Sequence, residues 1–485
     1  MLEQTIESRP YLRAIVLSVL GVVLVWEVIT RSFVAYLATA APQAALSLAP
    51  TNPDVLLNLA DKQLVERLEA ARRTGTARPS PGLLASSDAS RDPNDRTRAW
   101  AEVGARARGA DQQVGPATAP AGSGSAPPVD PHLAASDDQL RAWTELALIN
   151  DPLNARALRM LGQLAAVAGD EARTMKFMRA AATRSLHERF PIYLLMLKGI
   201  EKKDYAAAIY YADALLRTTP QALADVMPTL VYVAETPVAS SELKAVLAKN
   251  PPWRAEFFSA LPMAASDAHT PLELFLAIKD TLAPPTTADL RPYLNFLLEK
   301  KQYELAYFAW LQFLPAEQLR SVGFLYNGSF ELTPSGLPFD WVIVSGAGVT
   351  TEILNRPDQE GQHALLIRFE QGRVEFHGVT QLLMLAPGAY QFKGRFKGEI
   401  VGRRGLKWHI VCAAGAGRLG ESAMLIGATP AWRDIEFPFT VPSGNCRTQQ
   451  LRLDLDARMS SEQLVTGTMW FDELKIGRLA GEPNK

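Results

Sequence analysis

The sequence is poor in the residues from which metal centres and disulfide scaffolds are built. Its 485 residues include only 2 cysteines and 6 histidines, which excludes four-cysteine zinc and iron–sulfur sites and a multiply bridged scaffold. The net charge of −1 lacks the positive field of a general nucleic-acid binder. The HExxH, GxSxG and P-loop motifs are also missing. We therefore expect neither nucleic-acid binding nor enzymatic activity.

One glycine-rich segment, 415–420, matches the dinucleotide-binding fingerprint. The fingerprint requires a helix whose N-terminus binds the pyrophosphate, and Gly427 and Pro430 leave no room for such a helix. We interpret the segment as a hairpin loop and expect no nucleotide ligand.

An apolar run lies at the N-terminus, uninterrupted over 14–26 and looser over 28–38. About 20 residues cross the hydrocarbon core of a bilayer, so 12–38 is expected to be a transmembrane signal-anchor helix that continues into the first repeat. A cleaved signal peptide and a buried helix of a soluble protein are the alternatives. The segment 38–40 has the small residues of a cleavage site, but it lies too far behind the apolar run.

The charges around this segment predict its orientation. Arg9 and Arg13 precede the uninterrupted apolar run (14–26) and only Arg31 closely follows it, which favours a cytoplasmic N-terminal tail (1–11) with the bulk of the chain outside. In a Gram-negative bacterium, such a chain would be a single-pass inner-membrane protein with a periplasmic bulk.

The two cysteines support the same compartment, because Cys412 and Cys446 both lie in strand-like segments of the last domain. A disulfide between them would close a loop of about 35 residues and stabilise the fold by ~3–4 kcal/mol. Two buried free thiols are the alternative.

The middle of the chain has a 34-residue period, because apolar and small positions of 155–184 recur in 189–218. Each unit would be two amphipathic helices with a small residue where they cross closely. The unit at 202–220, with Asp204 followed by Tyr205, resembles the tetratricopeptide repeat.

The neighbouring segments extend this helical region. Residues 39–70 would begin it, and 136–318 would form a tetratricopeptide-like α-helical solenoid in which prolines such as Pro228 separate helices. Between these parts, 71–135 is rich in Ala, Gly, Pro, Ser and Arg. This composition buries too little apolar surface to fold, so we expect a disordered insertion.

The resemblance implies that the concave face of the solenoid binds protein partners. Four aromatic side chains near the end of the region occur at helical spacing: Tyr303, Tyr307, Phe308 and Trp310. We interpret them as core packing; a ligand groove is the alternative.

Near Gly323 the periodicity changes from helical to alternating. Leu451 and Leu453, for example, alternate with Arg452. About ten such strands, each with one apolar face, predict an antiparallel β-sandwich over 319–480. Pro438 is expected on an edge strand or a bulge. The predicted fold class is therefore multidomain, α followed by β: a transmembrane helix, a helical solenoid and an antiparallel sandwich.

The segments YNGSFELTPSGLPFDWVI (326–343) and GTMWFDELKIG (467–477) resemble the two ends of a carbohydrate-binding-module or galactose-binding-like jelly roll. The resemblance implies that the first and last strands pair and that a structural calcium ion lies between them. Its side-chain ligands would be Glu331 and Asp472, and backbone oxygens around Asn327 and Ser329 would complete the oxygen shell. No other metal or cofactor is expected, and the alternative is that the two acids are surface residues or make hydrogen bonds.

Sugar-binding sites need an aromatic platform beside polar groups that match hydroxyls. Trp408 and Trp432 are candidate platforms, with a place in the sandwich core as the alternative. Lys393, Arg395 and Lys397 alternate onto one outward face. They are candidates for binding an acidic polysaccharide through its carboxylate or phosphate groups; a solvated basic face is the alternative.

The whole arrangement resembles membrane-anchored accessory proteins of bacterial exopolysaccharide assembly. The resemblance implies a periplasmic scaffold that binds other envelope or polysaccharide-assembly proteins through its helical repeats and glycan through its jelly roll. A purely protein-binding scaffold is the first alternative, and a polysaccharide-modifying hydrolase is the second.

Overall fold

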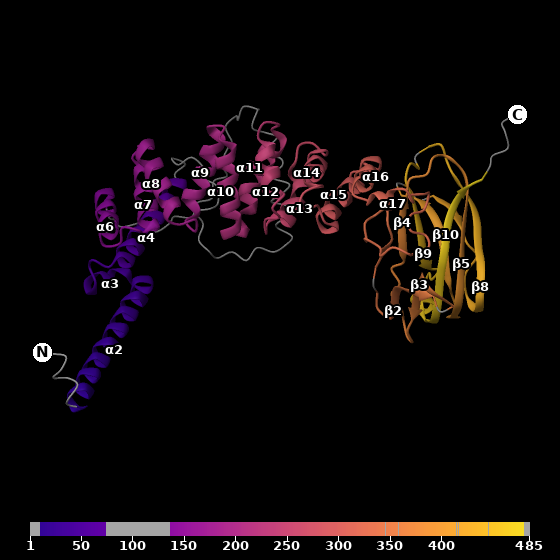
Figure 1. Ribbon diagram of the computed structural model, residues 1–485, viewed down its shortest axis with the longest axis horizontal. Coiled ribbons are helices and arrows are strands. Elements are labelled where there is room, and N and C mark those ends of the chain that lie inside the picture. Colours follow the sequence, from indigo (N-terminus) through magenta and orange to yellow (C-terminus); the bar gives the residue numbers. More distant parts are fainter. Residues whose placement is uncertain are drawn as a thin grey trace, which may run out of the picture. The chain divides into compact units, whose positions relative to one another are not determined.

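The computed structural model describes residues 10–73 and 136–479, apart from 345, 357, 414, 416 and 445. The chain divides into two compact units, Met1–Trp253 and Arg254–Lys485 (Figure 1). The predicted insertion (71–135) lies outside the described residues from 74 onward, so its predicted disorder stays a prediction.

The first unit is helical throughout the residues described. Its elements are α2 (Pro10–Ala40), α3 (Pro42–Leu48), α4 (Pro53–Arg73), α6 (Asp137–Asn150), α7 (Ala155–Val167), α8 (Glu171–Arg184), α9 (Arg189–Glu201), α10 (Tyr205–Thr218), η2 (Pro220–Ala222), α11 (Leu223–Glu235) and α12 (Ser240–Leu247).

Helix α2 is long enough and apolar enough to cross a membrane. Its stretch Leu17–Ala40 has a hydropathy of 1.8, and its most apolar part is not buried in the fold. A signal sequence would meet the same criteria.

The 34-residue period of the sequence reappears in the positions of the helices. Helices α7 and α9 begin at 155 and 189, and α8 and α10 begin at 171 and 205. Small residues lie where the paired helices meet, because a Cβ on Gly162 would be 2.7 Å from Met178 Cε. Pro228 was expected to separate helices but lies inside α11. Pro228 lies past the first turn, so it removes one i→i−4 hydrogen bond, and the helix continues because its apolar residues on both sides of the proline are buried.

The second unit begins with helices and ends with strands. Its helices are α13 (Arg254–Ala264), α14 (Thr270–Ile278), α15 (Thr287–Glu299), α16 (Tyr303–Gln312) and α17 (Ala316–Leu319). Its other elements are β1 (Val342–Ile343), β2 (Val349–Arg356), β3 (Gln359–Phe369), β4 (Val379–Leu383), β5 (Gly388–Gly402), β6 (Leu406–Cys412), β7 (Arg418–Glu421), β8 (Gly427–Val441), β9 (Gln449–Leu455), η3 (Ser460–Gln463) and β10 (Val465–Arg478).

The strands form the predicted antiparallel sandwich. One sheet has the order β1-β4-β9-β6-β7 and the other, which we call the Trp432 sheet, has the order β2-β3-β10-β5-β8. The alternating apolar residues, such as Phe392, Phe437 and Leu453, form one core between the sheets. Pro438 lies on β8, an edge strand, as predicted. The loop at 415–417 joins β6 to β7 and is followed by no helix.

The pairing of the first and last strands was predicted wrongly. Within the described residues, β1 pairs with β4 alone, whereas β10 pairs with β3 and β5. The opening segment and β10 share the hydrophobic core, and a hydrogen bond from Leu474 N to Gly328 O (2.9 Å) joins them. Asn327 and Phe330 have φ values of 48° and 54°, and this left-handed backbone interrupts any extended ladder.

Candidate functional site

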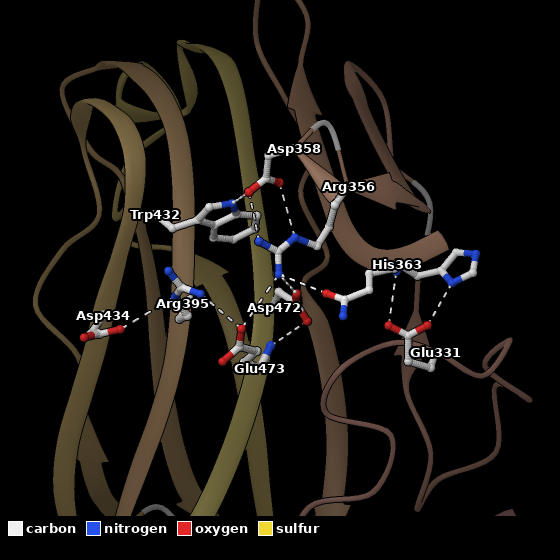
Figure 2. A network of polar contacts seen from close by, with 10 residues as sticks. Glu331, Arg356, Asp358, His363, Arg395, Trp432, Asp434, Asp472 and Glu473 are labelled. Atoms are coloured by element: carbon white, nitrogen blue, oxygen red, sulfur yellow. Dashed lines mark hydrogen bonds and ion pairs between the residues drawn. The ribbon is translucent and has the colours of Figure 1, made fainter. Parts of the chain in front are cut away.

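An arginine lies buried on the outward face of the Trp432 sheet. Arg356, at the end of β2, is 7% exposed. Its Nη1 lies 2.9 Å from Asp472 Oδ2, and its Nη2 lies 3.0 Å from Asp358 Oδ2. Its Nη1 is also 3.7 Å from Glu473 Oε1. Figure 2 shows these carboxylates converging on one guanidinium, Asp358 from the turn before β3 and the other two from β10.

A β-bulge brings two acids of β10 into this network. The register of β10 against β5 shifts between Asp472 and Lys475, and Glu473 has a φ of 54°. The extra residue at a bulge re-aims the side chains around it. Consecutive acids, which alternate across a regular strand, thus both reach Arg356.

Trp432 of β8 completes the network. Its Nε1 donates to Asp358 Oδ2 at 2.8 Å. The Arg356 guanidinium carbon lies 4.6 Å from the ring centroid, and that of Arg395 lies 5.8 Å from it. The half-buried indole is therefore held in place by a hydrogen bond and two cation–π contacts, rather than packed in the core.

The predicted basic face is interleaved with acids. Lys393 lies 3.5 Å from Glu436, and Arg395 lies 3.1 Å from Glu473 and 3.8 Å from Asp434. The acids Asp434 and Glu436 are directly opposite these cations on β8. This neutralisation could not be predicted from the sequence, because the opposing strand is about 40 residues away in the chain. Lys397 lies on the same strand, opposite Trp470 of β10.

The network shifts the pKa values of two of its acids in opposite directions. The hydrogen bond from Arg356 is the main cause that lowers the pKa of Asp358 to about 2. Burial raises the pKa of the Asp472 carboxyl, against the lowering effects of the Glu473 backbone N–H and of Arg356. Asp358 thus stays a carboxylate at neutral and mildly acidic pH, whereas Asp472 depends on its partner to stay charged.

We expect the stabilising effect of Asp358 to disappear in acid. A carboxyl with a lowered folded pKa contributes its full stability above the unfolded pKa of about 3.9 and loses it as pH falls through the folded value. Asp358→Asn should therefore destabilise the chain more at pH 4.5 than at pH 2.5, as measured by chemical denaturation. Asp434→Asn, whose side chain is 89% exposed, is the matched control. Equal losses at both pH values would contradict the Arg356 contact.

Trp408 is a core residue, which confirms the core interpretation and excludes it as a platform. It is 0% exposed, and its ring lies 5.6 Å from those of Phe392 and Phe471. Strand β6 turns alternate residues inward, and Trp408 falls between Leu406 and Ile410 on the core side. Trp432 is the candidate that reaches the outward face.

Three of the four predicted calcium ligands have other contacts. The backbone oxygen of Asn327 accepts a hydrogen bond from Trp341 Nε1 at 2.8 Å, and Glu331 Oε2 lies 3.0 Å from His363 Nδ1. Asp472 faces Arg356 instead, and Figure 2 shows the two acids directed at different partners. Within the described residues, no three His, Cys, Asp or Glu side chains group to hold a metal. Ser329 lies between Asn327 and Glu331 in the same loop.

The disulfide is present. Cys412 and Cys446 are bonded, with their Cα atoms 5.3 Å apart. Both are buried, and the bond joins the end of β6 to the loop before β9.

The helical aromatics mostly pack, as predicted. Trp310 is 2% exposed and contacts the rings of Tyr326 and Phe339, and Tyr307 contacts Phe339. Phe308 differs, because it is 52% exposed and lines an apolar hollow of about 480 Å³ beside α17.

The outward face of the other sheet is polar and partly buried. His409 lies 3.2 Å from Asp454, which also pairs with Arg452. Burial lowers the pKa of His409, against the raising effect of Asp454. No tryptophan lies on the outward side of these strands in the described chain.

Sequence reasoning missed Arg356, Asp358 and Glu473. Their signals were weak: a charged Arg-Pro-Asp turn after β2, and two consecutive acids that break the alternation of β10. Asp472 and Arg395 were foreseen in other roles, as a calcium ligand and as part of a basic face, whereas Trp432 was foreseen as a candidate platform.

No family model matches the chain, and no curated protein matches its sequence. Several solved structures align with about a third of it. A structure described as "CBM4 structure and function" has a TM-score of 0.24 and 14% identity, covering 32% of this chain and 99% of its own. The module TmCBM61, solved with beta-1,4-galactotriose, has a TM-score of 0.22 and 18% identity, covering 33% and 99%.

Larger proteins align only in part. The chain spans 26% of the arabinofuranosidase MgGH51, with a TM-score of 0.24 and 16% identity over 32% of this chain. At such TM-scores these likenesses say nothing of what this chain binds. Membership of the helical hairpins in the tetratricopeptide family stays a prediction.

Proposed function

We propose that this protein is a membrane-anchored, non-catalytic glycan-binding protein whose sugar site is the outward face of the Trp432 sheet. The observation that carries the proposal is the geometry of Trp432. Its indole is fixed by Asp358 and Arg356 and remains half-buried on the surface. An immobilised aromatic ring beside carboxylates and guanidiniums offers both an apolar surface and hydrogen-bonding groups.

These groups suit a sugar because sugars present apolar C–H faces and rings of hydroxyls. Asp358, Asp434 and Glu473 keep exposed fractions of 37%, 89% and 41%, so their oxygens have room to accept hydroxyl protons. Because the network holds its members in place, little side-chain entropy is lost on binding.

The charge balance favours a neutral glycan. Lys393 and Arg395 already have acidic partners, and an acidic polysaccharide would have to compete with those carboxylates. The acidic polymer predicted from the sequence is thus the second candidate ligand.

The helical region supports the anchoring and scaffolding roles. Helix α2 is the candidate membrane span, and stacked helical hairpins commonly bind other proteins. We propose that the helices bind envelope proteins of polysaccharide assembly or export, with the bulk of the chain in the periplasm. Tethering to one membrane would raise the local concentration of polymer near such partners.

The test is a binding assay of the full chain in detergent micelles against neutral and acidic polysaccharides. Trp432→Ala should weaken binding about tenfold or more, equivalent to at least ~1.4 kcal/mol. Trp432→Phe keeps the ring but loses the bond to Asp358, so it should retain part of the affinity. Trp143→Ala, which removes a half-buried tryptophan from α6, should bind normally.

Four outcomes would redirect the proposal. Loss of binding in His409→Ala but not in Trp432→Ala would move the sugar to the other sheet. Preference for acidic polymer that disappears in a Lys393→Gln/Lys397→Gln variant would restore the basic-face hypothesis. No binding to any polymer would leave the pure protein scaffold, and product release from a polymer would indicate the hydrolase.

A further inference from the structure

The last turns of α2 belong to the helical fold. Ala38 is 2% exposed and packs with Ala45 and Val55, while Val34 and Leu37 pack against the same cluster. The Ala38 carbonyl also accepts a hydrogen bond from Asn58 Nδ2 at 2.8 Å. The helix therefore continues without a break into the packed unit.

This packing protects the small-residue motif 38–40 from cleavage once the chain has folded. Proteases act on exposed segments that can be extended, but these residues are helical and Ala38 is buried. Removal of α2 would also expose Ala45 and Val55, which it covers.

The preceding turns present an apolar stripe away from the fold. Trp26, Ile29, Phe33 and Tyr36 recur at three- and four-residue intervals, which places them on one side of the helix. They are 69%, 57%, 54% and 66% exposed. The stripe extends the apolar surface of the helix beyond the charged residues Glu27 and Arg31.

Those charges neutralise each other. Arg31 Nη2 lies 2.7 Å from Glu27 Oε1, one helical turn away. A paired charge is less costly than a single one at the edge of the hydrocarbon layer, so this pair does not end the span.

We propose that α2 is retained in the mature protein, crosses the bilayer from about Arg13 to Phe33, and enters the fold at Val34 without a linker. Twenty residues of α-helix rise about 30 Å, the thickness of the hydrocarbon core. The occupant of the exposed stripe is phospholipid, with Phe33 and Tyr36 at the headgroup layer, where aromatic residues are favoured. This inference rests on the membrane anchoring proposed above and not on glycan binding.

A chain of polar contacts fixes the anchor to the helical unit. Asn58 accepts from Arg156 Nη1 at 2.6 Å, and Arg156 pairs with Asp61 at 2.8 Å. Arg159 joins Asp61 to Glu188, at 3.2 and 2.8 Å. The anchor is thus tied to α4, α7 and the start of α9, so the α3–α4 hairpin is held close to the headgroups.

Cysteine accessibility tests the inference directly, since both native cysteines are in the disulfide. The full chain is reconstituted in phosphatidylcholine–phosphatidylglycerol vesicles and treated with N-ethylmaleimide, which labels water-exposed thiols on both sides. Leu20→Cys and Ile29→Cys should stay unlabelled, whereas Leu48→Cys on α3, at a position 59% exposed, should label fully.

Urea separates protection by lipid from protection by the fold. Ala38→Cys should be unlabelled in native vesicles and labelled in urea, whereas Leu20→Cys should stay protected in both. Intact mass of the membrane-extracted protein should include residues 1–40. A mass lacking them, or labelling of Ile29→Cys or Ala38→Cys without urea, would overturn the inference. Glycan binding that depends on Trp432 is a separate readout and would be unaffected.

Discussion

Replacing Arg356 by glutamine is expected to lower the free energy of unfolding at pH 7 by about 3–5 kcal/mol, the usual cost of removing one partner of a buried ion pair. The reason is Asp472, whose side chain is 4% exposed and which pairs with Arg356 at 2.9 Å. Without the guanidinium, a buried carboxylate would lose its counter-charge. Chemical denaturation of the full chain, followed by tryptophan fluorescence, measures the change.

Two variants show whether the uncompensated charge is the cause. Arg356→Gln/Asp472→Asn should recover part of the loss, because neither buried group is then charged. Arg395→Gln removes a half-exposed arginine from the same face and should cost less than about 1 kcal/mol.

The pH dependence gives a further check on the same variant. Burial already raises the pKa of Asp472, and removal of Arg356 should raise it further. A carboxyl whose folded pKa exceeds its unfolded value of about 3.9 loses folded-state stability as pH rises between the two values. The deficit of Arg356→Gln should therefore be smaller at pH 5 than at pH 7. A constant deficit would mean that lost packing, not Asp472, is responsible.

The same arginine links stability to the proposed sugar site. Arg356 lies against the Trp432 ring and holds Asp358, which accepts the indole N–H. Loss of Arg356 should let Trp432 take up other rotamers. Glycan binding should therefore weaken even without denaturant, when the sandwich is still folded. An ordered aromatic surface is more effective in binding than a mobile one.

The sandwich itself could be predicted from the sequence because apolar and polar residues alternate along a strand that has one buried face. Phe437 and Leu453 face the core, as predicted from the polar residues that alternate with them along each strand. Alternation cannot distinguish a core tryptophan from an outward one at a strand with a bulge, and the register of β5 against β8 shifts between Phe396 and Gly398. Trp408 and Trp432 therefore looked equivalent and are not.

The Arg356 network could not be predicted for a different reason. Arg356 and Asp472 are 116 residues apart in the chain, and the pairing of β2 with β3, the pairing of β3 with β10 and the bulge at Glu473 together bring them into contact. Sequence patterns of local periodicity carry no information on such contacts. The helical part was easier, because the 34-residue period is local, although Pro228 shows that a proline does not always end a helix.

The second large effect is expected at the disulfide. A Cys412→Ser/Cys446→Ser variant should lose about 3–4 kcal/mol, because the bond closes a loop of about 35 residues and restricts the unfolded chain. Both cysteines are replaced so that no single thiol is left to cross-link two chains. Reduced wild-type protein should behave like the variant. Thiol titration of unfolded, unreduced protein should find none, and two titratable thiols would refute the bond.

The position of the bond predicts which strands respond. The loop between Cys412 and Cys446 contains β7 and β8, which are edge strands of opposite sheets. An edge strand has a ladder of hydrogen bonds on one side only, so the covalent link limits its fraying. Hydrogen exchange should rise first in β7 and β8 of the reduced protein, before the central strands. Because Trp432 lies on β8, reduction should also weaken glycan binding, which makes an oxidising compartment outside the cytoplasm a condition of the proposed function.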